Sequence, residues 1–220
     1  MCLLVSYDGV KGEMKLSKLE ELALEKQLQL LNKPSVKTIK TEWGDTYDCV
    51  DFYKQPAFDH PSLKNHNFHP GMKPTLTKIK QIPTNSTIDV SPNTWSGNER
   101  CPAGTVPIKR VTKNDLIRQR RMPPPEDFTS ESQLEDTNNN LEATGVYTVD
   151  PTLYGGTETR LFIHFQAGKT HCFNTLCSGF VLVNSDIAID GVFHSVTRKG
   201  KTIWEIALYI DRVQFMYLFV

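Results

Sequence analysis

The sequence predicts a mainly β protein, in which a first unit with one helix and a small β region precedes an incomplete antiparallel β-sandwich. Three observations support this prediction. The 220 residues include 13 glycines and 13 prolines, which favour turns over long helices. Short runs rich in β-branched and aromatic residues recur between those turns. Only one segment has the 3.6-residue period of an amphipathic helix.

The predicted helix spans residues 17–32. Ser17 and Glu20 form the sequence pattern of a capping box, and Pro34 stops the helix. Leucines recur at helical spacing between these limits: Leu19, Leu22, Leu28 and Leu31, with Leu24 and Leu30 widening the stripe. We expect a stripe of this width to lie against another part of the protein.

A small β region follows the helix. Residues 36–43 and 47–53 are predicted strands of a hairpin around Gly44 and Asp45, and residues 106–110 are a further short strand. From residue 55 to residue 92 prolines recur too often for regular elements. We expect this stretch to form an extended segment that lies over a surface.

Residues 111–140 differ in composition from both flanking regions. They are basic from 113 to 121 and then polar and acidic with little to bury, which predicts a linker. The run Arg118-Gln119-Arg120-Arg121 resembles a site for a processing protease, although such clusters are more often only solvated.

After the linker, short strand-like runs return at the spacing of an antiparallel sheet. They cover residues 146–149, 160–166, 179–183 and 202–210.

Charge and hydropathy argue against two classes of partner. Lys plus Arg and Asp plus Glu both number 25, so no net charge attracts nucleic acid or an anionic membrane. No apolar run approaches the roughly 18–20 residues of a transmembrane helix. The apolar run from Cys2 to Val5 is too short for a complete secretory signal, and we interpret residues 1–14 as the remnant of a signal region.

The cysteines bear on the cellular compartment. Four of the five can pair as Cys49–Cys101 and Cys172–Cys177, which leaves Cys2 in the segment that a signal peptidase would remove. This pairing favours an oxidising compartment, and four buried thiols in a cytosolic protein are the alternative. Asn85 begins an Asn-Ser-Thr glycosylation sequon, which has meaning only in a secreted chain.

Several long motifs of uncommon residues together resemble one family. YDCVDFYKQPAFDHPSLKNH, followed by CPAGTVPIKR, is similar to the activation peptide of the plant neprosin-like proteins. VDPTLYGGTETRLFIHF and HCFNTLCSGFVLVNSDIAI are similar to their catalytic domain. The resemblance implies an activation-peptide-like unit at residues 15–110, the linker at 111–140 and a partial catalytic-like domain at 141–220.

In that family the activation peptide precedes a secreted glutamic peptidase that cleaves after proline, so the resemblance implies a proline-containing peptide substrate. Such an enzyme needs two carboxyl groups, one held protonated and one that activates water. The family's first catalytic glutamate matches Glu142, but Thr144 and Val146 are inserted beside it and Tyr147 replaces a tryptophan. The second lies near the family's C-terminus, which this chain stops before reaching, and Glu205 does not match its motif.

The family also has several strands ahead of its first catalytic glutamate, and residues 111–140 are too polar to supply them. We therefore expect a truncated neprosin-like protein that is not a competent peptidase in this form. Two alternatives stay open. The activation-peptide-like unit is a binding module or an inhibitor in trans of a related peptidase, or the chain is a non-functional gene fragment. Only the inhibitor alternative predicts that residues 15–110 alone are soluble and slow an intact family member.

We expect no cofactor and no metal. His60, His66 and His69 with Asp59 match no standard ligand spacing, which favours packing or surface roles. Cys172 and Cys177 beside His171 lack a second ligand pair, so a short-loop disulfide is favoured over zinc.

Overall fold

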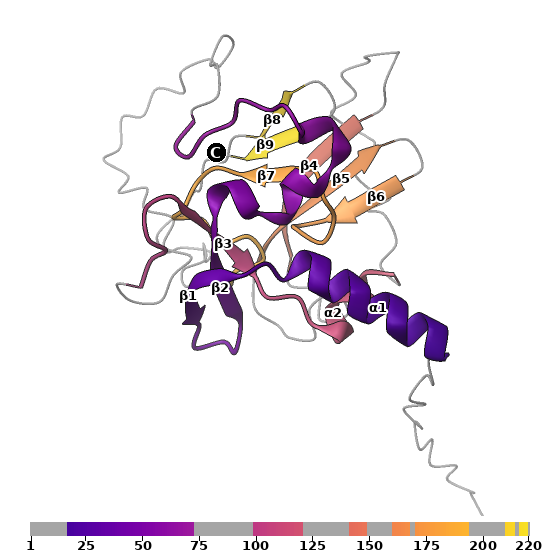
Figure 1. Ribbon diagram of the computed structural model, residues 1–220. Coiled ribbons are helices and arrows are strands. Elements are labelled where there is room, and N and C mark those ends of the chain that lie inside the picture. The colour runs from indigo at the N-terminus through magenta and orange to yellow at the C-terminus, as the bar shows by residue number, and fades with distance from the viewer. Residues whose placement is uncertain are drawn as a thin grey trace, which may run out of the picture.

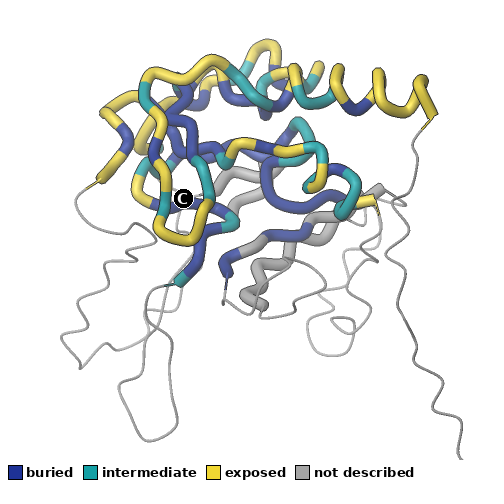
Figure 2. The backbone as a smooth tube through the Cα atoms, turned by 90° about the horizontal axis from the view of Figure 1, so that it is seen from below, coloured by how far each residue is buried: buried dark blue, intermediate teal, exposed yellow. Residues whose placement is uncertain are grey.

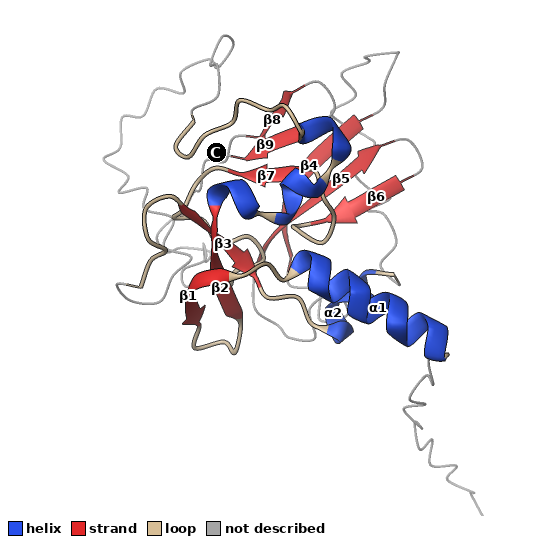
Figure 3. Ribbon diagram, viewed as in Figure 1, coloured by secondary structure: helices blue, strands red, loops and turns tan. Residues whose placement is uncertain are grey.

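The computed structural model describes residues 17–72, 99–120, 141–148, 160–167, 170–193, 210–213 and 216–219. Within these ranges the chain is mainly β, as predicted, with three three-stranded sheets and two α-helices (Figure 1, Figure 3). None of the helices in the described ranges combines the length and the apolar composition that crossing a membrane requires.

The first sheet has the order β1-β2-β3 and is antiparallel throughout. It consists of β1 (Ser35–Lys40), β2 (Thr46–Asp51) and β3 (Thr105–Lys109). The first two strands form the predicted hairpin, and Gly44 in its turn has a φ of +83°, a conformation that favours glycine. The hairpin and the predicted third strand are therefore confirmed.

Helical turns occupy much of the segment that the prolines predicted to be extended. Three short 3-10 helices follow β2: η1 (Phe52–Lys54), η2 (Pro56–Asp59) and η3 (Pro61–Leu63). Pro56 and Pro61 each stand at the first position of a turn, where their fixed φ is favourable. The extended prediction, which begins at residue 55, is wrong for η2 and η3, and the strand predicted at 47–53 ends at Asp51, where η1 follows. The predicted extended stretch from 73 to 92 lies outside the described residues.

The predicted helix is confirmed as α1 (Lys18–Leu31), and its N-terminal capping box joins Ser17 to Glu20. The predicted linker begins with a second helix, α2 (Lys113–Gln119), which has its own capping box. A small apolar cluster, built mainly from Leu24, Leu31, Val111 and Leu116, joins the two helices. Leu19, Leu22 and Leu30 are exposed, so only part of the predicted leucine stripe packs against the protein.

The remaining strands form two further sheets. The sheet of order β4-β5-β6 is antiparallel and contains β4 (Leu141–Thr148), β5 (Arg160–Ala167) and β6 (Thr170–Phe173). The sheet of order β7-β9-β8 contains β7 (Phe180–Leu182), β8 (Ile210–Val213) and β9 (Met216–Phe219). β7 pairs with β9 in parallel, which departs from the expected antiparallel arrangement. The predicted run at 202–210 lies outside the described residues except for its last position.

One hydrophobic core joins the two predicted units. Its largest cluster takes seven side chains from residues before 110 and eight from residues after 160. They are Val50, Phe52, Ala57, Leu63, Phe68, Val106 and Ile108, with Leu161, Ile163, Phe180, Val181, Leu182, Val183, Ile187 and Ile189. Figure 2 shows these buried stretches gathered inside the described part of the chain, with exposed residues along the outer side of α1. The domain boundaries stay predictions, but the units are not separated by solvent.

Candidate functional site

Glu142, the residue that matches the family's first catalytic glutamate, lies in β4. It stands opposite Gln166 of β5, and β4 pairs with β5 along its whole length. The register runs from Leu141 to Thr148 without a bulge, so Thr144 and Val146 are regular members of the strand. The three strands of this sheet contain no carboxyl side chain besides Glu142. These three strands therefore contain one carboxyl group, whereas the chemistry that the resemblance implies needs two.

The same pair of strands contains a buried histidine that the sequence did not single out. His164 of β5 stands opposite Thr144 and is 5% exposed. Its ring packs against Phe173 with the centroids 4.9 Å apart. Its place in the ladder puts an imidazole two register positions from Glu142, whereas nothing in the local sequence distinguishes it from an ordinary strand residue.

Four charged residues form a buried cluster where the two units meet. Lys109 Nζ lies 3.0 Å from Asp45 Oδ1 and 2.7 Å from Asp190 Oδ2. Arg160 donates to Asp45 Oδ2 at 2.7 Å and to the carbonyl oxygen of Asp190 at 2.9 Å. Each side chain is less than a fifth exposed. Buried charges are stable only when opposite charges or hydrogen bonds replace their lost hydration, so removing any one of these four side chains would leave a buried charge without its partner.

Burial and ion pairing shift the pKa values in this cluster. Burial raises the pKa of Asp190, and the pairing with Lys109 only partly opposes that rise. Burial would lower the pKa of Arg160, but its hydrogen bond and ion pair with Asp45 outweigh burial and raise it. Asp190 has a positive φ of 65°, which places its carboxylate in a tight turn beside β5. The cluster is a structural joint between the units, and it was not predicted because its members are far apart in sequence.

A second joint connects Gln55 to β7. The N–H of Leu182 donates to Gln55 Oε1 at 2.9 Å, and Gln55 Nε2 donates to the carbonyl oxygen of Leu182 at 3.1 Å. Nearby, Tyr47 donates its hydroxyl hydrogen to the carbonyl oxygen of Ile189 at 3.0 Å. Gln55 and Tyr47 are almost completely buried. Side chains of the first unit therefore satisfy backbone groups of the second.

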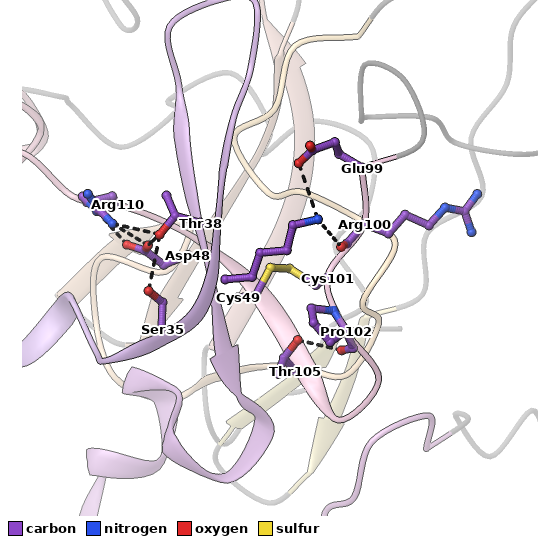
Figure 4. The surroundings of a disulfide bond; sticks show 11 residues. Ser35, Thr38, Asp48, Cys49, Glu99, Arg100, Cys101, Pro102, Thr105 and Arg110 are labelled. Atoms are coloured by element: carbon purple, nitrogen blue, oxygen red, sulfur yellow. Dashed lines mark hydrogen bonds and ion pairs between the residues drawn. A yellow bond between two sulfur atoms is a disulfide. The ribbon is translucent and has the colours of Figure 1, made fainter.

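Both predicted disulfides are present. Cys49–Cys101 joins β2 to the turn before β3, and Figure 4 shows this bond near Glu99 and Arg100. Lys37 Nζ lies 3.5 Å from the Glu99 carboxylate and donates to the carbonyl oxygen of Arg100 at 3.3 Å. Cys172–Cys177 closes the turn after β6, and the amide of Gln119 lies 3.5 Å and 3.7 Å from its two sulfur atoms. The predicted glycosylation site at Asn85 lies outside the described residues, as does Glu205.

Of the three histidines in the activation-peptide-like unit, His66 packs against aromatic side chains, whereas His69 is exposed. The ring of His66 stacks on Phe58 at a centroid distance of 4.0 Å, and its Nδ1 accepts a hydrogen bond from the N–H of Phe68 at 3.2 Å. Asp59 pairs with Lys33 at 2.6 Å. Among the described residues, no three potential ligands gather in a way that would hold a metal ion.

A cleft of about 40 Å³ lies between α2 and the turn after β6. Its charged lining includes Lys109, Asp115, Arg118 and Asp190. These four take part in the ion pairs Lys109–Asp190 and Arg118–Asp115. Ligand pockets commonly occupy about 300–1,000 Å³, so this cleft is too small for a peptide.

Comparison with protein families divides the chain into two overlapping parts. Residues 38–147, half of the chain, match the family model of the neprosin activation peptide. Residues 128–215 match the family model of neprosin. Gln55 lies in the first match and Leu182 in the second, so the hydrogen-bonded pair described above joins the two matched parts.

Proposed function

Because this chain belongs to the neprosin-like family, we propose that it is a latent peptidase whose activation-peptide-like unit is packed onto peptidase-like strands. The observation that carries this proposal is the shared core. Phe52 and Val50 of the first unit lie in one cluster with Val181 and Leu182 of the second, and all four are fully buried. A unit attached this tightly covers the strands that it contacts.

The reaction proposed for the active form is hydrolysis of a peptide bond after proline, as the family resemblance implies. Glu142 would be one of the two carboxyl groups of a glutamic peptidase. One group must be protonated to assist the departing amine while the other activates water. We propose a secreted protein, because the two disulfides and the family both favour an oxidising compartment. No cofactor is needed for this chemistry.

In the form printed above we propose that the chain has no peptidase activity of its own, because the first unit shares its core with the strands. The test is an assay of purified 1–220 on a proline-containing fluorogenic peptide, before and after limited cleavage between residues 121 and 140. We expect no turnover by the intact chain. Turnover after cleavage that Glu142→Gln abolishes would show that the first unit causes the latency and that a second carboxyl group, unmatched in the sequence, completes the pair. Glu25→Gln on the exposed side of α1 is the matched control and leaves turnover unchanged.

Two outcomes would contradict parts of this proposal. Cleavage by the intact chain that Glu142→Gln abolishes would rule out latency but support the peptidase assignment. Inactivity of the nicked chain toward a panel of proline peptides would contradict latency as the cause of the inactivity and would agree with the unmatched second glutamate.

A binding function of the first unit is the second candidate, with a related peptidase as the partner. It is favoured by the disulfide and the sheet within the unit at residues 15–110, and by the apolar cluster in which α1 packs against α2, the helix that follows the unit. Residues 17–120 expressed alone would then have the circular dichroism of a folded protein and slow an active family member at stoichiometric concentration. An unfolded product without inhibition would exclude this candidate.

A further inference from the structure

At Leu182, one edge of β7 is hydrogen-bonded to a side chain. Both backbone groups of Leu182 bond to the amide of Gln55, at 2.9 Å and 3.1 Å. β9 pairs with β7 in parallel along Phe180–Leu182. Because the two groups of Leu182 are used by Gln55, they lie on the edge of β7 that β9 leaves open. In Figure 1 the turns that follow β2 run beside β7, as these bonds require.

The Gln55 amide imitates a peptide group. A primary amide offers one carbonyl oxygen and N–H donors, as a backbone peptide unit does. Gln55 is 1% exposed, and its Nε2 also donates to the carbonyl oxygen of Phe52 at 3.0 Å, which fixes the plane of the amide. The paired bonds to Leu182 therefore resemble those that a neighbouring strand would make.

The rest of β7 lacks the features that usually block an open edge. Natural edge strands carry lysine, proline or a bulge, which prevent pairing with another chain. β7 consists of Phe180, Val181 and Leu182 and has none of these. Within the described part of the chain, the partner of Leu182 on this edge is Gln55 of the first unit.

We propose that the outer edge of β7 at Leu182 is a main-chain binding site for an extended substrate peptide, and that Gln55 occupies this site in the latent form. The inference rests on the proposed peptidase function and adds a substrate subsite to it. Addition of a peptide to a strand edge is a common mode of recognition. Proline has no backbone N–H, but only the peptide residue opposite Leu182 must supply both an N–H and a C=O. A peptide with prolines at other positions therefore still fits.

The first test changes the donor pattern of residue 55 in the full chain. Gln55→Glu keeps the shape, but an ionised carboxylate has no donor for the carbonyl oxygen of Leu182, whereas a protonated one donates and accepts. We expect the hydrogen-exchange protection factor of the Leu182 amide to fall at least tenfold at pH 7. It should recover as pH falls through the pKa of the introduced carboxyl group, which burial beside a carbonyl raises. Gln55→Met, without either group, should show low protection at every pH.

The second test adds a peptide. In a Gln55→Ala, Glu142→Gln chain that has been cleaved between residues 121 and 140, a capped hexapeptide with two prolines in excess should restore the protection of the Leu182 amide at least tenfold. The same peptide with a methyl group on its pairing nitrogen should not. If Gln55→Ala loosens the whole chain, Gln55→Glu at pH 7 takes its place. Equal protection by both peptides, or by neither, would overturn the inference.

These results are separate from those of the proposed function. Turnover that depends on Glu142, without protection of Leu182 by the peptide, would leave the peptidase standing and remove this subsite. Protection without turnover would support a peptide-binding edge in a protein that is not a peptidase.

Discussion

Two buried carboxyl groups have pKa values displaced in opposite directions. Burial would raise the pKa of Asp48, but hydrogen bonds from Arg110 and Thr38 outweigh burial and lower it. Figure 4 shows both donors converging on this carboxylate, with Arg110 Nε at 2.7 Å and the Thr38 hydroxyl at 2.8 Å. Burial raises the pKa of Asp190, since its one oxygen that pairs with Lys109 does not fully compensate for lost hydration. The other oxygen, Asp190 Oδ1, is buried and has no hydrogen-bond partner among the residues that the structure describes.

These shifts predict opposite effects of pH on stability. The pKa of Asp48 is lower in the folded state than its value of about 3.9 in the unfolded state, so its ionised carboxylate stabilises the fold above about pH 3.9. This contribution to the free energy of unfolding is lost as pH falls through the folded-state pKa. The pKa of Asp190 is higher in the folded state than its value of about 3.9 in the unfolded state. Its contribution to the free energy of unfolding is therefore fully present below about pH 3.9 and is lost as pH rises through the folded-state pKa.

The two carboxyls can be compared by urea unfolding between pH 2 and pH 7. The free energy of unfolding of the unmodified chain minus that of Asp48→Asn should increase with pH. The same difference for Asp190→Asn should decrease with pH. Differences that change in the same direction would show that one of the two assignments is wrong.

Among the elements, α1 presents leucines of two kinds at helical spacing. Leu24 is completely buried against α2, whereas Leu22 is 63% exposed. Replacing either with alanine changes the same chemical groups in the same helix. Leu24→Ala should therefore lower the free energy of unfolding by about 2–5 kcal/mol and Leu22→Ala by no more than about 0.5 kcal/mol. Equal losses in urea titrations of the two variants would mean that α1 does not pack as described.

The two disulfides close loops of very different length. The cysteines are 52 positions apart in Cys49–Cys101 and 5 apart in Cys172–Cys177. The chain-entropy model gives about 4 kcal/mol for the longer loop and about 2 kcal/mol for the shorter one. Replacing each pair with serine should reproduce this order in the free energy of unfolding. The reverse order would indicate that the short bond has a larger role in the native state, for example through its contact with Gln119.

For the whole molecule, the shared core should make the two units unfold together. Phe52 of the first unit is completely buried in the cluster that contains β7, while its neighbour Tyr53 is 57% exposed. Phe52→Ala should cost about 3–5 kcal/mol, and this loss should appear in the hydrogen-exchange protection of β5 and β7 as well as β2.

Tyr53→Ala is the matched control and should cost less than about 1 kcal/mol. If Phe52→Ala reduced protection in β2 alone, the units would be independent domains, and the latency proposed here would lose its basis.

Local features could be predicted to within a few residues where neighbours in sequence are also neighbours in space. The capping box at Ser17, the turn at Gly44 and the strands at residues 160–166 and 179–183 belong to this class. The helix α2 was missed because a single buried leucine, Leu116, is hidden among basic residues. The 3-10 turns at residues 52–63 were missed because frequent prolines suit both an extended chain and short turns.

The candidate site divides in the same way. Glu142 and the four bridged cysteines could be named from motifs, since each lies within a distinctive run of residues. Gln55, His164 and the cluster of Asp45, Lys109, Arg160 and Asp190 could not. The hydrogen-bond partner of Gln55 is 127 positions away in the chain, and that of Asp45 is 115 positions away. A glutamine or an aspartate has no local signature when its role depends on a distant group.

The sequence by itself determined the mainly β class, the hairpin, the first helix and the family, and it allowed the pairing of the cysteines that the structure contains. These features follow from hydrophobic periodicity, turn-forming residues and motifs, each of which involves residues close together in the sequence. Only the tertiary structure decided that the two units share a core and that a side chain of one closes a strand edge of the other. The physical reason is that burial and hydrogen-bond satisfaction belong to pairs of surfaces, and a sequence does not state which surfaces meet.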